Sequence, residues 1–248
     1  MSFADHFSSV AAAYAAYRPH YPAELVDLLA ERSPARDAAW DAGCGNGQLS
    51  VALAARFAHV FATDPSQAQL DAAMATGRHP HVEYRRATAE ASGLPDASVD
   101  LAVAAQAAHW FDWPRYLAEV ARVARPGALV ALVSYGILHV EGAEPAIARY
   151  YHDAVGPYWP PERRHVENGY RDLTWPWPAV AAPALAMTAS WTRAELLGYI
   201  ATWSATVKLV DAEGRAKYDA LAAELAAIWP DAERRIVRWP LTIRLARR

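Results

Sequence analysis

The spacing of apolar residues changes its period several times along the first 135 residues. Apolar side chains that recur every three or four positions predict helices, and such segments are residues 22–32, 48–57, 66–75 and 114–124. Short apolar runs between them predict buried strands, at residues 38–42, 59–63, 82–86, 99–105 and 128–134. Strands that alternate with such helices indicate βαβ units and a parallel sheet with helices on both faces. Ligands in such sheets bind beyond the carboxyl ends of the strands.

Residues 137–190 interrupt this alternation with many aromatic residues and prolines. Regular patterns return at Thr192, which has Glu195 three positions on, the spacing of a capping box at the start of a helix. A further helix is predicted at residues 214–228, and a late, antiparallel strand at residues 236–246. We therefore expect an aromatic-rich insertion after the fifth strand, followed by helices and strands that complete the fold.

The composition narrows the class of protein. With 248 residues, of which 54% are hydrophobic and 21% charged, the chain can bury a large core. It has no run of about 20 apolar residues, which a membrane-spanning helix needs, and we expect no secretory signal. The net charge of −3 opposes binding to nucleic acid, which draws on clustered Lys and Arg. The single cysteine, Cys44, fits a reducing cytoplasm.

The most informative segment is the glycine-rich loop Asp41-Ala42-Gly43-Cys44-Gly45-Asn46-Gly47, between the first predicted strand and a helix. Glycines at this spacing let the backbone turn sharply and approach a ligand. Dinucleotide-binding loops read Gly-x-Gly-x-x-Gly, and Gln48 stands where their last glycine belongs. The Asp41 carboxylate would repel a pyrophosphate and attract an ammonium group. We therefore predict a cationic nucleoside–amino-acid ligand rather than NAD; a loop-capping role for Asp41 is the alternative.

A second acidic residue, Asp64, ends the next predicted strand. An acidic side chain at that position can accept hydrogen bonds from both hydroxyls of a ribose. Because Pro65 and Ser66 follow, Asp64 could instead cap the N-terminus of the next helix. The residue supports a nucleoside ligand without identifying it.

Together these segments resemble the class I S-adenosylmethionine-dependent methyltransferases. The loop 41–47 matches the family's Asp/Glu-x-Gly-x-Gly-x-Gly pattern, and Asp64 matches its acidic ribose ligand. Later segments resemble the family in order, and these are Ala89-Glu90, Leu94-Pro95, Ser98-Val99-Asp100 and Arg125-Pro126-Gly127. The resemblance covers about residues 35–135 and implies S-adenosyl-L-methionine as the cofactor.

Shorter motifs resemble one branch of that family, the type 11 methyltransferases, which include trans-aconitate methyltransferase-like enzymes of small molecules. The motifs are residues 17–22, 109–112, 191–192, Tyr199 and 202–205. The resemblance implies an α/β, Rossmann-like, doubly wound fold with a mostly parallel seven-stranded sheet and an antiparallel last strand. It implies one methyltransferase domain that consists of N-terminal cap helices (residues 1–34), a cofactor-binding core (35–135), a substrate lid (137–190) and C-terminal helices and strands (191–248).

The resemblance implies a set of cofactor-binding residues, namely Tyr17, Arg18, Asp41, Gly43, Cys44, Gly45, Gly47, Asp64, Pro65, Ala89, Glu90 and Gln106. The three glycines are expected to line the methionine moiety, and Asp41 to hold its ammonium group directly or through water. Ala89 and Glu90 are expected near the adenine, although Glu90 could be a solvated residue. Tyr17 and Arg18 are expected to cap the cofactor, with Arg18 on its carboxylate; a surface helix packed on the sheet is the alternative.

Residues 106–111 follow the fourth strand, where the resemblance places the methyl group to be transferred. His109 could orient an acceptor or accept a proton there. Trp110 could face a sulfonium through a cation–π contact or exclude water. Both are therefore predicted to be catalytic residues, with a structural histidine and a buried core tryptophan as the alternatives.

We predict a cytoplasmic methyltransferase of a small molecule, with a carboxylate as the favoured acceptor because a carboxylate is ionised at neutral pH and needs no base. Arg163, Arg164 and His165 could meet such an anion, or form a solvated run of charge. We expect no nucleic acid, membrane or metal as a partner, and a monomer or homodimer. Two other classes stay open: an NAD(P)-dependent oxidoreductase, which Asp41 and Gln48 oppose, and an S-adenosylmethionine-binding protein without catalytic activity.

Overall fold

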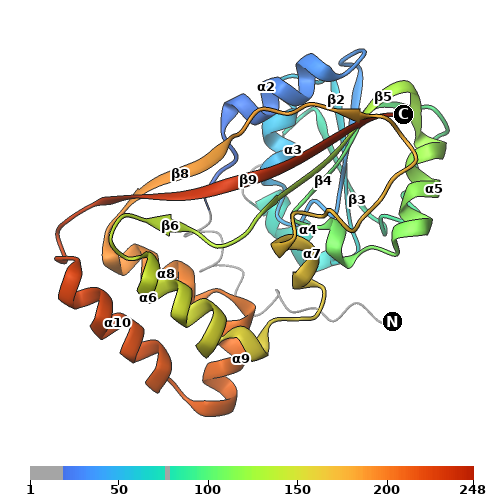
Figure 1. The fold of residues 1–248 in the computed structure, drawn as a ribbon. Helices are drawn as coiled ribbons and strands as arrows, with labels where there is room; N and C mark the ends of the chain where they lie inside the picture. Colours follow the sequence, from blue (N-terminus) through green and yellow to red (C-terminus); the bar gives the residue numbers. More distant parts are fainter. Residues whose placement is uncertain (1–18, 76–78) are drawn as a thin grey trace. The chain divides into compact units, whose positions relative to one another are not determined.

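A computed structural model describes residues 19–75 and 79–248 (Figure 1). These residues form two compact units. The core unit comprises His20–Tyr135, Arg164–Leu185 and Leu241–Arg248. The helical unit comprises, in its described part, Pro19, Gly136–Arg163 and Ala186–Pro240. The expected insertion at residues 137–190 is therefore divided between the two units, and its role as a substrate lid stays a prediction.

The core unit is built on a sheet with the strand order β3-β2-β1-β4-β5-β9. Its strands are β1 (Ala38–Ala42), β2 (His59–Asp64), β3 (Val82–Arg86), β4 (Val99–Ala105), β5 (Ala124–Tyr135), β7 (Ala179–Val180) and the second half of β9 (Arg235–Arg247). Strands β1 to β5 pair in parallel, whereas β9 is antiparallel to β5 and β7 is antiparallel to β9. The predicted Rossmann-like, doubly wound α/β fold with an antiparallel last strand is confirmed.

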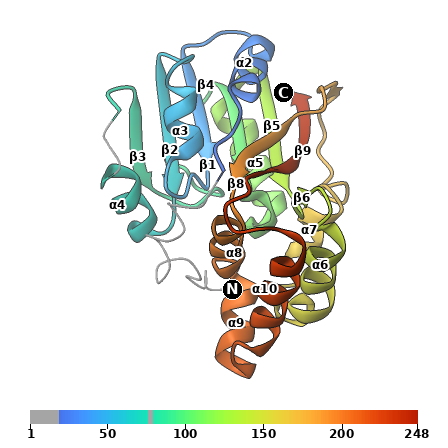
Figure 2. The same ribbon diagram turned by 90° about the vertical axis from the view of Figure 1, so that its left-hand side faces the viewer.

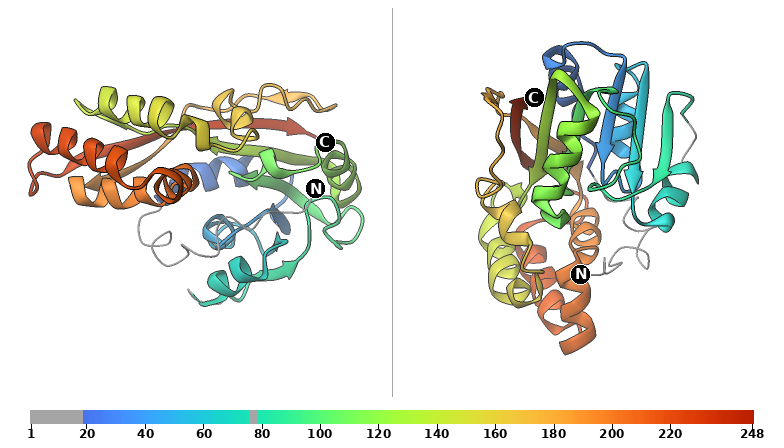
Figure 3. Two further views of the ribbon diagram at one scale, coloured as in Figure 1. Left: turned by 90° about the horizontal axis from the view of Figure 1, so that it is seen from below. Right: turned by 90° about the vertical axis from the view of Figure 1, so that its right-hand side faces the viewer.

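Helices cover both faces of this sheet. The helices of the core unit are α2 (Ala23–Arg32), α3 (Gln48–Leu53), α4 (Gln67–Ala75), α5 (Trp113–Val123), the short turn η2 (Ala108–Trp110) and α7 (Arg163–Glu167), which begins at the unit boundary. Successive strand residues point to opposite faces. Leu101 and Leu129 accordingly pack with α2 and α3, and Ala102 and Val130 with α5. Helices α2 and α3 lie in front of the strands in Figure 2, and α5 lies in front of them in the opposite view of Figure 3 (right).

Most predicted boundaries in the core unit agree with the structure to within a few residues, but β5 differs. It begins at Ala124 rather than at residue 128, because Arg125-Pro126-Gly127, expected as a stop, stays in the sheet. Gly127 takes a φ of 79°, and its N–H donates to the carbonyl of Arg248 at 2.7 Å. Helix α3 also ends earlier than predicted, at Leu53, and the chain continues in turns.

The helical unit combines helices with short strands. Its elements are β6 (His139–Val140), α6 (Glu144–Arg149), the π-helix η3 (Tyr150–Ala154), η4 (Gly156–Tyr158), β8 (Ala186–Trp191), α8 (Arg193–Ala201), α9 (Ser204–Glu213) and α10 (Ala216–Ile228). Strands β6 and β8 pair antiparallel with residues 235–240 of β9. The described residues thus hold nine strands, two beyond the predicted seven, because β7 and β8 also pair with β9. The capping box of Thr192 and Glu195 is confirmed at the start of α8.

Within the described ranges, no helix combines the length and the apolar character needed to cross a membrane.

Candidate functional site

The glycine-rich loop joins β1 to α3 and takes left-handed backbone conformations. The φ angles of Gly43, Gly45 and Gly47 are 70°, 54° and 79°, values that favour glycine. A side chain at Gly43 would place its Cβ 2.7 Å from the Cβ of Ala107, and one at Gly47 would collide with the Tyr84 hydroxyl. A Cβ at Gly45 would meet a single atom within 4 Å, at 3.8 Å. Packing therefore requires glycine at positions 43 and 47, whereas Gly45 faces open space.

Asp64, at the end of β2, ties the loop to the sheet with both carboxylate oxygens. Oδ2 accepts the backbone N–H of Gly45 at 2.9 Å, and Oδ1 accepts that of Ser66 at 2.8 Å. The side chain is only 7% exposed. The bond from Ser66 forms an Asx turn ahead of helix α4. The N-terminus of α4 is capped not by Asp64 but by Oγ of Ser66, which accepts the backbone N–H of Gln69 at 3.4 Å. Because each carboxylate oxygen can accept more than one hydrogen bond, the predicted contact with a ribose is compatible with both bonds.

Asp41, in β1, holds a carboxylate that is almost completely buried, with 1% exposure. Ser50 in α3 donates from Oγ to Oδ2 at 2.6 Å, whereas Oδ1 has no hydrogen-bond partner among the described residues. Burial raises the pKa of Asp41 to about 7; the bond from Ser50 opposes this rise, and the charge of Asp64 adds to it. An unsatisfied buried acceptor costs about 1–3 kcal/mol. The site therefore favours a ligand that brings a positively charged donor.

The chemistry of S-adenosyl-L-methionine fits this set of groups. Its ammonium group can donate to Oδ1 of Asp41, its ribose hydroxyls can donate to Asp64, and Gly45 leaves space beside the loop. Two carboxylates in a loop without a basic residue suit a pyrophosphate poorly. In the part of the chain that the structure describes, no group of three or more His, Cys, Asp or Glu residues is placed to hold a metal ion.

Two further residues at the loop were not predicted. One is Ser50, which carries the hydrogen bond to Asp41. The other is Tyr84 in β3, which lies against Gly47 and whose pKa burial raises to about 12. Burial also raises the pKa of the Cys44 thiol, and a protonated thiol is a poor nucleophile. A protonated Cys44 thiol is compatible with the predicted role of lining the loop.

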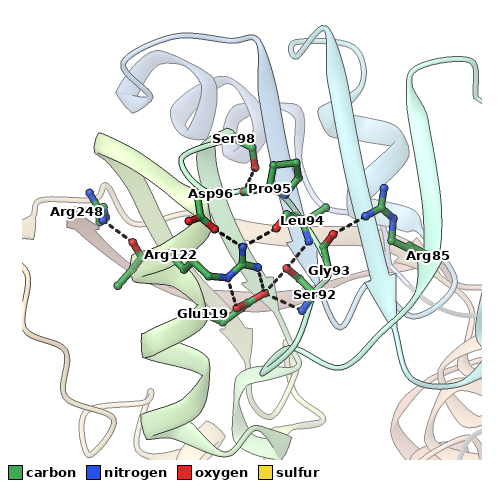
Figure 4. Close-up of polar contacts among 11 residues, drawn as sticks. Arg85, Ser92, Gly93, Leu94, Pro95, Asp96, Ser98, Glu119, Arg122 and Arg248 are labelled. Atoms are coloured by element: carbon green, nitrogen blue, oxygen red, sulfur yellow. Dashed lines mark hydrogen bonds and ion pairs between the residues drawn. The ribbon is translucent and has the colours of Figure 1, made fainter.

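The segment between β3 and β4 has little regular structure and is held by a polar network (Figure 4). Glu119 of α5 accepts the backbone N–H of Ser92 at 2.8 Å and its hydroxyl at 2.5 Å. Arg122 pairs with Glu119 at 2.7 Å, donates to the carbonyl of Leu94 at 2.7 Å and pairs with Asp96 at 2.6 Å. The network fixes the stretch of chain for which the resemblance implies a contact with adenine.

Ala89 and Glu90 begin that stretch. Ala89 is 5% exposed and packs in the core with the residues of α5. Oε1 of Glu90 accepts the backbone N–H of Asp112 at 2.9 Å, just before α5. Glu90 is therefore more than a solvated residue, because it holds the start of a helix, and its contact with the cofactor stays a prediction.

Gln106 follows β4 and has a positive φ of 56°. Its Nε2 donates to the carbonyl of Tyr135 at 3.1 Å, and its Oε1 accepts the backbone N–H of Tyr135 at 3.0 Å. The side chain thus joins the ends of β4 and β5. Its role in cofactor binding stays a prediction beside this structural one.

His109 lies in the turn η2 after β4 and is 8% exposed. Its Nδ1 is 2.9 Å from the hydroxyl of Tyr170, and its ring centroid is 4.8 Å from that of Trp110. Tyr170 is fully buried at a φ of 58°, and Arg244 donates to its carbonyl. The two predicted catalytic residues are neighbours in the sequence, and the structure adds Tyr170 as a partner of His109, a contact that no local sequence pattern predicts.

The remaining predicted residues are Pro65, Tyr17 and Arg18. The carbonyl of Pro65 accepts a hydrogen bond from Nε of Arg86 at 3.2 Å, which fixes the turn after β2. Tyr17 and Arg18 lie outside the described residues, so the cap that they are expected to form stays a prediction.

Comparison with known proteins gives consistent likenesses. A family model described as a methyltransferase domain matches residues 40–132. A Dictyostelium discoideum protein named as a methyltransferase is 33% identical over 215 residues, which are 85% of this chain and 81% of that protein. A solved structure from Anaeromyxobacter dehalogenans, described as a type II methyltransferase, is 45% identical with a TM-score of 0.87, and the match covers 93% of this chain and 98% of the other.

A third relative carries the cofactor in its name. It is a Mycobacterium tuberculosis protein named as an S-adenosylmethionine-dependent methyltransferase, 38% identical over 103 residues, which are 41% of this chain and 36% of that protein. None of these names is that of an oxidoreductase. The comparisons therefore oppose the NAD(P)-dependent alternative, in agreement with the charge of Asp41.

Proposed function

Because this chain belongs to the S-adenosylmethionine-dependent methyltransferases and is therefore an enzyme, we propose that it transfers the methyl group to a small molecule, with a carboxylate as the favoured acceptor. The product would be a methyl ester. The trans-aconitate methyltransferase-like branch, which the short motifs resemble, is part of the same proposal. We assign the reaction to the groups after β1, β2 and β4.

We assign the cofactor contacts to groups at the loop that lack a hydrogen-bond partner, can accept a further hydrogen bond or face open space. Asp41 binds the ammonium group through Oδ1, and Asp64 accepts hydrogen bonds from the ribose in addition to those from Gly45 and Ser66. The backbone at Gly45 lies against the methionine moiety. When bound, S-adenosyl-L-methionine supplies a methyl group on a sulfonium, which is electrophilic without further activation.

The chain's own contribution to the reaction is then mainly to position the acceptor. Positioning of this kind contributes on the order of 7–11 kcal/mol to lowering a barrier. His109 orients the acceptor and Trp110 excludes water in this proposal. Both stand in the turn after β4, and the bond from Gln106 to the end of β5 fixes the start of that turn.

The observation that carries the choice of a carboxylate is the partner of His109. In histidine bases of the Ser-His-Asp type, Nδ1 donates to a carboxylate that stabilises the protonated ring. Here Nδ1 faces the neutral hydroxyl of Tyr170. A phenol gives the protonated ring less support than an anion does, so His109 is better suited to orient an acceptor than to take its proton. An acceptor that is already ionised at neutral pH has no proton to lose, so it does not need His109 as a base.

The proposal is tested by transfer of a radiolabelled methyl group from S-adenosyl-L-methionine to panels of carboxylates, phenols and amines. We expect label in the carboxylate panel, and a fall in turnover of less than about tenfold in His109→Ala. General base catalysis typically contributes about 10²- to 10⁴-fold, so a loss of that size would contradict a carboxylate acceptor. Binding of the cofactor without transfer to any of the three panels would contradict the proposed class of acceptor.

A further inference from the structure

The structure separates the three neighbouring residues Arg163, Arg164 and His165. Arg164 is exposed. His165 is engaged, with Nδ1 2.6 Å from Oδ2 of Asp172. Arg163 is half-buried, as His165 is, but differs from both neighbours because its guanidinium lies against aromatic rings of the helical unit. The run of charge is therefore not uniformly solvated, and one of its members occupies a defined environment.

Two aromatic rings hold the guanidinium of Arg163. Its Cζ lies 4.8 Å from the ring centroid of Trp159 and 5.7 Å from that of Tyr151. Nε donates to the Tyr151 hydroxyl at 2.9 Å. The two rings are 5.1 Å apart and both pack near Trp203, at 5.9 Å and 5.6 Å. Stacking and the bond to Tyr151 together fix the plane of the guanidinium before any ligand arrives.

The charge of Arg163 is not balanced by a carboxylate in the described part of the chain. Six other basic residues of the helical unit have acidic partners, in the pairs Arg149–Glu224, Arg193–Asp231, Arg215–Asp219, Lys217–Glu213, Arg234–Glu195 and Arg235–Glu233. Lys208 and Arg238 form no ion pair among the described residues either, but only Arg163 of these three has its charged group stacked on aromatic rings there. The hydrogen bond of Arg163 to Tyr151 uses Nε, which leaves the two terminal nitrogens for a ligand. In the same stack, the buried Nε1 of Trp159 has no acceptor among the described residues. The stack therefore has more donors than acceptors.

We propose that Arg163, supported by Tyr151 and Trp159, binds the carboxylate of an organic anion. The planar fork of a guanidinium matches a carboxylate in bidentate fashion. The aromatic rings beside it give an apolar surface for the hydrocarbon part of such a molecule, which an inorganic anion does not use. The inference concerns the helical unit alone and stands whether or not this anion is the methyl acceptor.

The test is calorimetric titration of the full chain with acetate, succinate, citrate and phenylacetate, and with inorganic phosphate for comparison. We expect at least one carboxylate to bind the wild type more tightly than phosphate does. Arg163→Met, which keeps the apolar stem, should weaken that binding about tenfold or more, since charge-assisted hydrogen bonds are lost. Arg163→Lys keeps the charge without the fork and should lose less.

Arg164→Met is the matched control, because it removes a neighbouring exposed charge, and it should bind as the wild type does. If Arg163→Met does not fold, as judged by circular dichroism and the thermal midpoint, Tyr151→Phe serves instead. It removes only the hydroxyl that holds Nε and should weaken binding about threefold, at the low end of a hydrogen bond's contribution. Absence of carboxylate binding, phosphate binding as tight as that of the best carboxylate, or equal binding by the two Met variants would overturn the proposal.

Discussion

The core unit and the helical unit use their charged residues differently. In the core unit, the nearly buried carboxylates of Asp64, Asp100 and Glu119 accept backbone N–H groups and so hold loops and strand ends. In the helical unit, ion pairs such as Arg215–Asp219 join side chains that are 66% and 58% exposed, and such pairs add little stability. Buried carboxylates therefore stabilise loops and strand ends in the core unit, whereas exposed ion pairs of the helical unit lie at its surface and contribute little to its stability.

Each unit also contains a charged group that departs from this pattern. Asp41 is buried in the core unit, yet its Oδ1 has no partner among the described residues. Arg163 is half-buried in the helical unit without an acidic partner there. The comparison indicates a site for a cation in the first case and for an anion in the second.

The largest effect is expected from Asp41→Asn. This change keeps the shape of the side chain and an acceptor for Ser50 but removes the negative charge from the proposed ammonium site. Loss of one partner of a buried charge pair typically costs about 2–5 kcal/mol, so calorimetry should show S-adenosylhomocysteine binding weakened by about a hundredfold. Asp37→Asn removes an acid whose side chain is 73% exposed and is the control. Equal affinity of the two variants would contradict the role of Asp41.

Substitutions at two glycines of the loop should affect the free energy of unfolding and the affinity for the cofactor differently. Gly47→Ala forces a left-handed conformation on alanine and a collision with Tyr84, so thermal unfolding should show a loss of about 2–4 kcal/mol. Gly45→Ala meets no such collision and should cost about 1–2 kcal/mol, while it weakens cofactor binding by filling the open side of the loop. Combining Gly47→Ala with Tyr84→Phe should recover part of the lost stability. A larger loss in Gly45→Ala would show that packing does not distinguish the two positions.

The raised pKa of Asp41 predicts a pH dependence. Because its pKa is about 7 in the folded protein, the ionised form needed for an ammonium ligand disappears below that pH. Affinity for S-adenosylhomocysteine should therefore fall up to about tenfold per pH unit below 7 and be level above it. For folding, Asp41 ionises near pH 4 when unfolded, so its contribution to the free energy of unfolding should fall as the pH rises from about 4 to about 7. This contribution is measured as the difference between the wild type and Asp41→Asn at each pH. The fall in affinity below pH 7 should be absent in Asp41→Asn.

The smallest effect is expected from Tyr170→Phe. The ring and its packing remain, but His109 loses the hydroxyl that lies 2.9 Å from Nδ1. We expect turnover on a carboxylate to fall about threefold, the size of one weak hydrogen bond, with the KM for the acceptor changing as well. Nitrogen-15 spectra of the His109 ring should show a changed proton position. Unchanged spectra would mean that Tyr170 does not set the state of His109.

Local patterns predicted the parts of the fold that depend on neighbours in sequence. Apolar runs gave β1 to β4 closely, and the spacing of the glycines gave the loop beside Asp41. Patterns failed where distant segments meet. The contact of Tyr84 with Gly47 and that of Tyr170 with His109 join residues 37 and 61 positions apart, and no period in the sequence relates such residues.

Backbone conformation set a second limit on prediction. A non-glycine residue with positive φ is uncommon. No sequence pattern therefore predicts that Gln106 takes such a φ and that its side chain donates a hydrogen bond to Tyr135 at the end of β5. The strand β5 also continues through Arg125-Pro126-Gly127, which reads locally as a stop. In both cases pairing with another strand outweighs the local preference.

The most direct test of the account is a crystal structure of the full chain with S-adenosylhomocysteine. We predict that the ammonium group lies within hydrogen-bonding distance of Oδ1 of Asp41, and that the ribose hydroxyls donate to the carboxylate of Asp64. A ribose bound elsewhere, or an Asp41 carboxylate that makes no contact with the ammonium group directly or through water, would contradict it.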